Sequence, residues 1–198
     1  MINLPKHIEL KFYGAIIGKI KIEDFEKWIY SNEEIESILS EDDYLELISF
    51  NYKESGAKYE LVDFLSEKYV DLGEYEKWKI LQKLNIALKR DKRLPEILRE
   101  FYDLYCRGYT FLNDLGLGYG LTVEVPPSGN YKAESWEEMP EKEKSELLDS
   151  FYPQLDLDIK RTIDWIEKGK ILLTGKKDEI GHYEYKDLRT EEESKSTD

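Results

Sequence analysis

Residues 73–116 read GEYEKWKILQKLNIALKRDKRLPEILREFYDLYCRGYTFLNDLG, and this stretch decides the fold class of the chain. Its apolar residues recur every three or four positions, which is the spacing of one face of an α-helix. Pro95 suits the first turn of a second helix, which we expect to continue until Gly116 ends it. The apolar residues that carry this spacing are Tyr75, Trp78, Leu81, Leu84, Leu88, Ile97, Phe101, Leu104, Tyr105, Phe111, Leu112 and Leu115. The segment therefore predicts two long amphipathic helices.

Shorter helices are expected before this segment. Ser31 with Glu34, and Ser40 with Asp43, have the spacing of helix-capping pairs, and each pair precedes an apolar run. Residues 57–69 continue the helical spacing after a Ser-Gly break. A match at an offset of 50 residues, IEDFEKW at 22–28 against LGEYEKW at 72–78, fits either a duplicated helical unit or two similar amphipathic first turns.

The sequence changes character after Gly116. Three glycines at 116, 118 and 120 are expected to interrupt the helix, and residues 121–125 have the composition of a strand. A second helical section should follow, its first helix starting from a capping pair at Ser135 and Glu138. Residues 171–174 and 180–185 could then pair as a hairpin. The fold class predicted is mainly α, with a small β-hairpin or short β element in the C-terminal third.

The domain organisation expected is a single helical domain over residues 1–189, with a subdivision allowed near 116–135. The final segment, 190–198, reads TEEESKSTD and has no apolar residue to bury, so we expect a disordered acidic tail. One cysteine and the lack of a signal-peptide pattern or a run of about 20 apolar residues predict a cytoplasmic protein without a membrane span.

Charge limits the partners that the chain can bind. With 43 acidic and 29 basic residues its net charge is −14, so it should repel nucleic acid and anionic membranes. Its 15 tyrosines and four tryptophans are residue types that anchor protein interfaces. The composition therefore favours binding to a basic protein, with the oligomeric state left open.

No pattern in the chain predicts catalysis, a metal or a cofactor. His7 and His182 have no neighbours at the spacing of metal ligands or of a catalytic triad. Cys106 lies within an expected helix with no nearby histidine. Acidic pairs such as Asp156 and Asp158 are too numerous to single out a hydrolytic site, and the glycine-rich segment 116–120 lacks the lysine of a phosphate-binding loop.

The segment 116–138 is the candidate partner-binding surface, because long irregular segments that carry aromatic residues are often binding surfaces. We expect the glycines to expose Tyr119, and Trp136 could equally belong to the core. The candidate residues are Tyr119, Glu124, Tyr131, Glu134, Trp136, Glu137 and Glu138. The acidic helices between Glu33 and Glu46 are the next candidate surface.

Taken as a whole, the chain resembles the small acidic bacterial immunity proteins that neutralise polymorphic toxins. The resemblance is one of class, with segments such as EDFEKWIY at 23–30, YLELISF at 44–50 and LGLGYGLTVEVPP at 115–127. It implies a non-enzymatic inhibitor that binds a basic toxin domain, and it assigns no inhibitory residue. Two other readings stay open: a helical adaptor or regulatory protein without a toxin partner, and a hydrolase whose carboxylate pair is not identified.

Overall fold

The computed structural model describes residues 4–127, 133 and 135–195, and it divides the chain into two compact units, Met1–Leu72 and Gly73–Asp198. The mainly α class is confirmed, and so is a small β-hairpin near the C-terminus. The single domain expected over residues 1–189 stays a prediction; the boundary between the compact units lies at residue 72, away from the subdivision allowed near 116–135. The boundary falls at the first residue of α6, Leu72–Ala87, and the packing within each unit reveals it.

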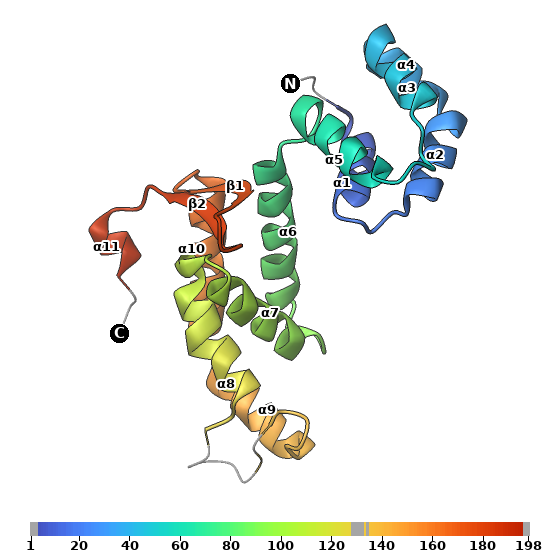
Figure 1. Ribbon diagram of the computed structural model, residues 1–198. Coiled ribbons are helices and arrows are strands. Elements are labelled where there is room, and N and C mark those ends of the chain that lie inside the picture. The colour runs from blue at the N-terminus through green and yellow to red at the C-terminus, as the bar shows by residue number, and fades with distance from the viewer. Residues whose placement is uncertain (1–3, 128–132, 134, 196–198) are drawn as a thin grey trace. The chain divides into compact units, whose positions relative to one another are not determined.

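The first unit contains the helices α1 Lys6–Ile16, α2 Ile22–Ser31, α3 Glu33–Ile38, α4 Glu41–Ser49 and α5 Ala57–Lys68 (Figure 1). Phe12 is fully buried in its core, with the rings of Phe25, Trp28 and Tyr69 placed edge-on 5.7–6.1 Å away. Such edge-to-face pairs stabilise a core beyond the area that they bury. Aromatic residues from α1, α2 and the end of α5 thus bring the helices of this unit together.

Two helix starts in the first unit test the capping pairs. Ser40 caps α4, because its hydroxyl accepts a hydrogen bond from the amide of Asp43 at 3.2 Å, as expected. Ser31 does not cap α3. It is the last residue of α2, and Asn32 caps α3 instead by accepting from the amide of Glu34.

The second unit contains α6 Leu72–Ala87, whose first residue precedes the unit boundary, followed by α7 Leu94–Cys106 and a 3₁₀ turn, η1 Thr110–Leu112. Both long helices begin where the sequence predicts, but α7 ends at Cys106 and does not reach Leu115. Gly108 follows in a left-handed conformation with φ 110°, and a Cβ there would lie 2.8 Å from the carbonyl oxygen of Tyr183. The close approach of the hairpin therefore requires a glycine, and the helix ends before it.

The three-glycine segment is helical, which corrects two predictions. Residues Asp114–Gly120 form a π-helix, η2, and Leu121–Glu124 form a short helix, α8, where a strand was expected. Gly116 and Gly120 face α7 so closely that a Cβ at Gly116 would lie 3.1 Å from the carbonyl oxygen of Phe101. These glycines let η2 pack closely against α7. This tertiary contact explains why glycines that suggest a break lie within a helix.

The rest of the second unit consists of α9 Glu141–Ser150, α10 Gln154–Glu167, β1 Ile171–Lys177, β2 Tyr183–Asp187 and α11 Glu191–Ser194. Ser135 and Glu138 do not start a helix, since α9 begins after Pro140. The two strands pair antiparallel, with Leu173 opposite Tyr185, and the second begins three residues later than predicted. The ring of Tyr183 stacks on Tyr109 at 4.8 Å, which fixes the hairpin against the core.

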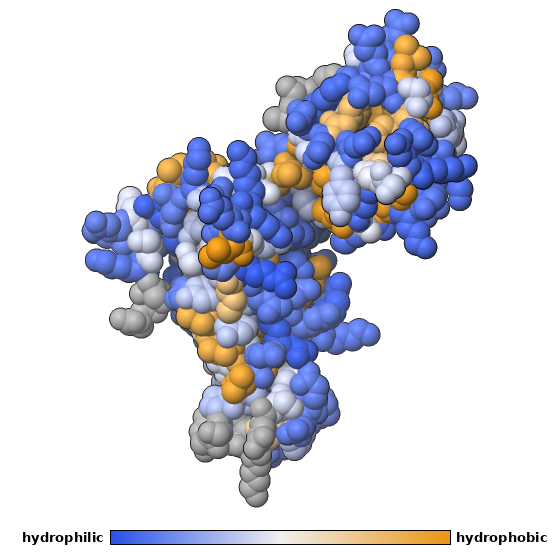
Figure 2. All heavy atoms as spheres, in the orientation of Figure 1, coloured by the Kyte–Doolittle hydropathy of each residue, from blue (hydrophilic) through white to orange (hydrophobic). Residues whose placement is uncertain are grey.

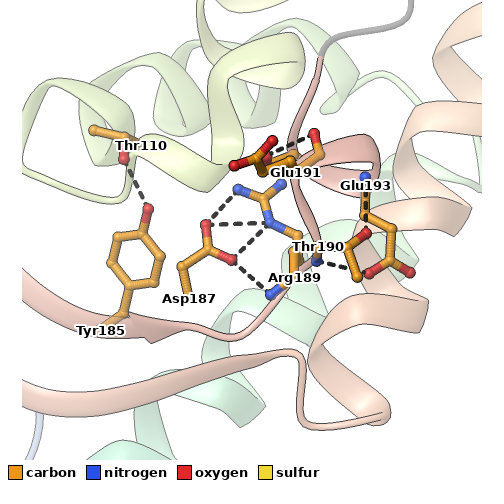
Figure 3. A network of polar contacts seen from close by, with 8 residues as sticks. Thr110, Tyr185, Asp187, Arg189, Thr190, Glu191 and Glu193 are labelled. Carbon is orange, nitrogen blue, oxygen red and sulfur yellow. Dashed lines mark hydrogen bonds and ion pairs between the residues drawn. The ribbon is translucent and has the colours of Figure 1, made fainter.

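Separate polar contacts lie along the hairpin and at the start of the C-terminal helix (Figure 3). The hydroxyls of Thr110 and Tyr185 are 2.7 Å apart. Further along, Arg189 donates to both carboxylate oxygens of Asp187, at 2.7–3.2 Å. Thr190 and Glu193 form a reciprocal capping box at the start of α11. A tail was expected here, but the described part, 190–195, holds this helical turn.

Candidate functional site

Tyr119 lies on η2 and turns inward, although the sequence suggested that the glycines expose it. Its hydroxyl donates to Asp158 on α10 at 2.6 Å, and its ring packs edge-on against Phe151 at 5.1 Å. Burial, followed by the bond to Asp158, raises the pKa of the Tyr119 hydroxyl. Tyr119 is therefore an internal contact between η2 and α10.

Asp158 is buried and lies at the centre of a polar network. It accepts hydrogen bonds from Tyr119, from the side-chain amide of Gln154 at 3.0 Å and from Arg161 at 2.7 Å. Arg161 also reaches Asp114 at 2.6 Å, so the network joins both ends of η2 to α10. A buried carboxylate that is paired and hydrogen-bonded in this way is typical of a structural contact. Asp156 and Asp158, which the sequence places close together, contact different residues. Asp156 forms an ion pair with Arg90, whereas Asp158 belongs to this network.

Two of the predicted acidic residues meet at one arginine. Glu137 and Glu124 lie 2.8 Å and 3.8 Å from the guanidinium of Arg99 on α7. The backbone amide of Glu137 itself, and then Arg99, lower the pKa of the Glu137 carboxyl. Trp136 is half-buried and packs against the core, while Glu138 is exposed. Tyr131 and Glu134 lie outside the described residues. The structure thus joins Glu124 and Glu137, and it places Tyr119 and Trp136 partly in the core.

A stronger acidic surface lies on α2, α3 and α4 of the first unit. Between Glu23 and Glu46 the chain carries ten acidic residues and one lysine. Acidic residues in the first turns of α3 and α4 also stabilise the helix dipoles, which is a structural role that needs no partner. On α3 and α4, four carboxylates are exposed and have no ion pair within the described part of the chain: Glu33, Glu36, Glu41 and Asp42. We call these four residues the acidic face.

The other three carboxylates of α3 and α4 contact side chains from α1 and from the end of α5. Lys68 at the end of α5 contacts Asp43 at 2.6 Å and Glu46 at 3.1 Å, and the hydroxyl of Tyr69 also donates to Asp43. On α3, Glu34 pairs with His7 of α1 at 2.8 Å. These contacts fix α3 and α4 to the core, so the acidic face is presented on anchored helices.

Two large apolar side chains are exposed on the same helices. Tyr30 on α2 is 57% exposed and Leu45 on α4 is 50% exposed. The hydroxyl of Tyr30 donates to the carbonyl oxygen of Ile48 at 3.1 Å, and Leu45 is three residues from Ile48, so it lies on the same side of α4. Figure 2 shows small hydrophobic areas on this unit within a largely hydrophilic surface. Apolar residues beside unpaired charge are typical of a protein interface.

Metal-ligand clusters and membrane-spanning helices are two further features that the described residues lack. No three His, Cys, Asp or Glu side chains among them gather as ligands of a metal ion, and none of the described helices is long and apolar enough to cross a bilayer. Cys106 is exposed, and His182 lies 3.9 Å from Asp178 at the surface.

The Asp43 contact predicts a specific acid sensitivity. Lys68 and then Tyr69 lower the pKa of Asp43 below its usual 3.8. A carboxyl group with a lowered folded-state pKa adds stability that is present above its unfolded-state pKa and lost as the pH falls through the folded-state value. We expect Asp43→Asn to lower the melting temperature at neutral pH. The difference in melting temperature between this variant and the parent chain should become smaller as the pH falls below about 4.

The control for this experiment is Asp63→Asn, since Asp63 is exposed on α5 and has no ion pair among the described residues. Thermal melting followed by circular dichroism, repeated across the acid range, measures both variants. If the melting-temperature difference between Asp43→Asn and the parent chain stayed constant with pH, it would contradict the stabilising role given to the Asp43 carboxylate.

Comparison with known proteins adds no assignment: no protein-family model, curated protein or solved structure matches the chain.

Proposed function

We propose that the protein is a non-enzymatic inhibitor that binds a basic protein domain, in the manner of an immunity protein that neutralises a toxin. The observation that carries this proposal is the acidic face, with four exposed and unpaired carboxylates on helices anchored by Lys68 and His7. Tyr30 and Leu45 supply apolar contact area beside that charge. The field of a −14 protein attracts a basic domain over a distance, and the exposed apolar groups then hold it.

The acidic face replaces the segment 116–138 as the leading surface for the partner. In that segment Tyr119 is committed to Asp158, and Glu124 and Glu137 share Arg99. Partly neutralised carboxylates attract a cationic partner less than unpaired ones do. Trp136, Glu137 and Glu138 are kept as a secondary contact in the proposal.

The test compares two variants with the same net charge. One carries Glu33→Gln, Glu36→Gln, Glu41→Gln and Asp42→Asn. The control carries Gln at four exposed glutamates of the second unit: Glu167, Glu179, Glu184 and Glu192. Each set of changes moves the net charge from −14 to −10. Melting temperatures must first show that both variants are folded, because the first set also removes favourable helix-dipole interactions.

The partner is captured from the native host on the parent chain, and association is then measured at low and physiological salt. We expect the acidic-face variant to associate about tenfold more slowly at low salt, and the control to change by less than about twofold. Leu45→Ala should mainly speed dissociation. Equal association rates for the two folded variants would overturn the choice of surface.

The activity of the captured partner decides between inhibitor and adaptor. Loss of that activity at one equivalent of the chain supports inhibition. A partner that binds but keeps its activity would contradict inhibition and favour a helical adaptor instead. A partner without a basic surface would contradict the electrostatic basis of the proposal.

A further inference from the structure

A groove in the first unit has a character opposite to that of the acidic face. It lies between the connection from α1 to α2 and the start of α5, and its volume is about 420 Å³. A second hollow of about 420 Å³ adjoins it and shares Ile22, Glu23 and Lys58 with it. Volumes of about 300–1,000 Å³ are typical of sites for small molecules. We call the two hollows together the lysine groove.

The lining of the lysine groove is apolar at depth. Ala15 and Leu61 are buried beneath it, at 6% and 3% exposure, while Ile20 and Ile22 are half-buried along its length. Tyr59 lines the second hollow and is 78% exposed. An apolar body bound there would cover surface that is now in contact with water.

Cations without partners surround the lysine groove. Lys21, Lys53 and Lys58 line it, and Lys19 lies two residues from Lys21 in the same connection. All four are exposed, and none has an ion pair among the described residues. The other four lysines of the unit are engaged: three in ion pairs and Lys11 over the ring of Trp28. Residues 1–72 hold sixteen acidic residues and eight lysines, so this gathering of unpaired lysines runs against the charge of the unit.

The positive charge of Lys58 lies over the groove. Its ammonium nitrogen would lie 3.1 Å from a Cβ at Gly18, so the side chain extends over the connection that forms the opposite wall. Two exposed glutamates, Glu23 and Glu54, also line the groove, but its three lining lysines outnumber them. Glu23 is in the first turn of α2, where the helix dipole is positive, and Glu54 accepts a hydrogen bond from Asn51 at 3.1 Å.

We propose that the lysine groove binds a small amphiphilic anion, with its charged head near Lys21 and Lys58 and its apolar body along Ile20 and Ile22. The apolar depth gives a simple inorganic anion little to contact. A long polyanion would meet Glu23 and Glu54. A single negative head on an apolar body satisfies both conditions. This site is independent of the proposed inhibitory function, because it uses neither the acidic face nor a protein partner.

The probe for the test is 1-anilinonaphthalene-8-sulfonate, which joins one sulfonate to aromatic rings and fluoresces when it leaves water. We expect saturable binding at one site per chain. Lys58→Gln should weaken that binding about tenfold, since one charge contact of about 1.4 kcal/mol corresponds to this factor. Lys21→Gln should act in the same direction.

Matched controls separate this site from general dye binding. Lys27→Gln removes an exposed lysine that pairs with Asp24, and Leu45→Ala removes exposed apolar area on α4. Both should leave the binding constant within about twofold of the parent. Octanoate should displace the dye, whereas octyltrimethylammonium, with the same tail and opposite charge, should not. Inorganic phosphate should displace it only at far higher concentrations.

Three results would overturn the proposal: no saturable binding by the parent chain, equal binding by folded Lys58→Gln and Lys27→Gln variants, or equal displacement by octanoate and octyltrimethylammonium. None of these measurements involves the protein partner, so failure of the groove and failure of the proposed inhibition are distinguishable.

Discussion

Replacing Gly120 with alanine is expected to destabilise the second unit by about 3 kcal/mol or more, because overpacking against backbone cannot be relieved by a rotamer change. A Cβ at position 120 would overlap the carbonyl oxygen of Leu98 on α7 and would lie 2.9 Å from the Cβ of Tyr102. Leu98 is fully buried, so α7 cannot move away without opening the core. The melting temperature of the unit should fall by roughly 10 °C.

Gly118 provides the matched control within the same π-helix. A Cβ there has no atom within 4 Å among the described residues. Gly118→Ala should change stability by less than about 1 kcal/mol, with a gain favoured because alanine restricts the unfolded chain more than glycine does. Thermal melting of both variants decides the matter. Equal losses would mean that the glycines serve backbone conformation and not close packing against α7.

Removing the carboxylate of Asp158 is the second change with a large expected effect. Asp158→Ala should cost about 3 kcal/mol, because it removes the buried carboxylate that Tyr119, Gln154 and Arg161 share and leaves Arg161 with Asp114 alone. Tyr119→Phe, which keeps the ring and removes only the hydroxyl, should cost about 1–2 kcal/mol. The loss of stability should be larger for Asp158→Ala, because three hydrogen bonds converge on its carboxylate and Tyr119→Phe removes only one of them.

Asp164 on the same helix is the control for Asp158. It pairs with Lys168 at 2.8 Å, but the two side chains are 47% and 63% exposed, so Asp164→Ala should cost about 0.5 kcal/mol or less. Chemical denaturation of the three variants measures the series. A loss for Asp158→Ala no larger than that for Asp164→Ala would show that the network is not a structural centre. Tyr119 would then return as a candidate for partner binding.

Much of the helical architecture follows from apolar spacing. The predicted starts of α6 and α7, the helix over residues 57–69 and the cap at Ser40 agree with the structure. The hairpin was also predicted, with its second strand displaced by three residues. These elements could be predicted because each depends on residues close together in the sequence: a stripe of apolar residues, a capping hydroxyl, or a strand composition between turns.

Some features of the candidate surfaces could be predicted from the sequence, and others could not. The concentration of acidic residues between Glu23 and Glu46 is a property of the sequence. Which carboxylates are paired is not, since Lys68 and His7 reach Asp43 and Glu34 from helices distant in the chain. The lysine groove also brings together residues near 20 and near 58, and no local pattern links them.

The sequence sufficed for the mainly α class, the C-terminal hairpin and the acidic charge, because periodicity and composition depend only on neighbouring residues. The boundary at Leu72, the π-helix at Asp114–Gly120 and the inward turn of Tyr119 came only from the folded chain. In isolation, three alternating glycines predict a break in a helix, because glycine costs a helix about 1 kcal/mol relative to alanine. Two of them, Gly116 and Gly120, let η2 lie directly against the backbone of α7, and this close packing stabilises a helix that local propensity disfavours.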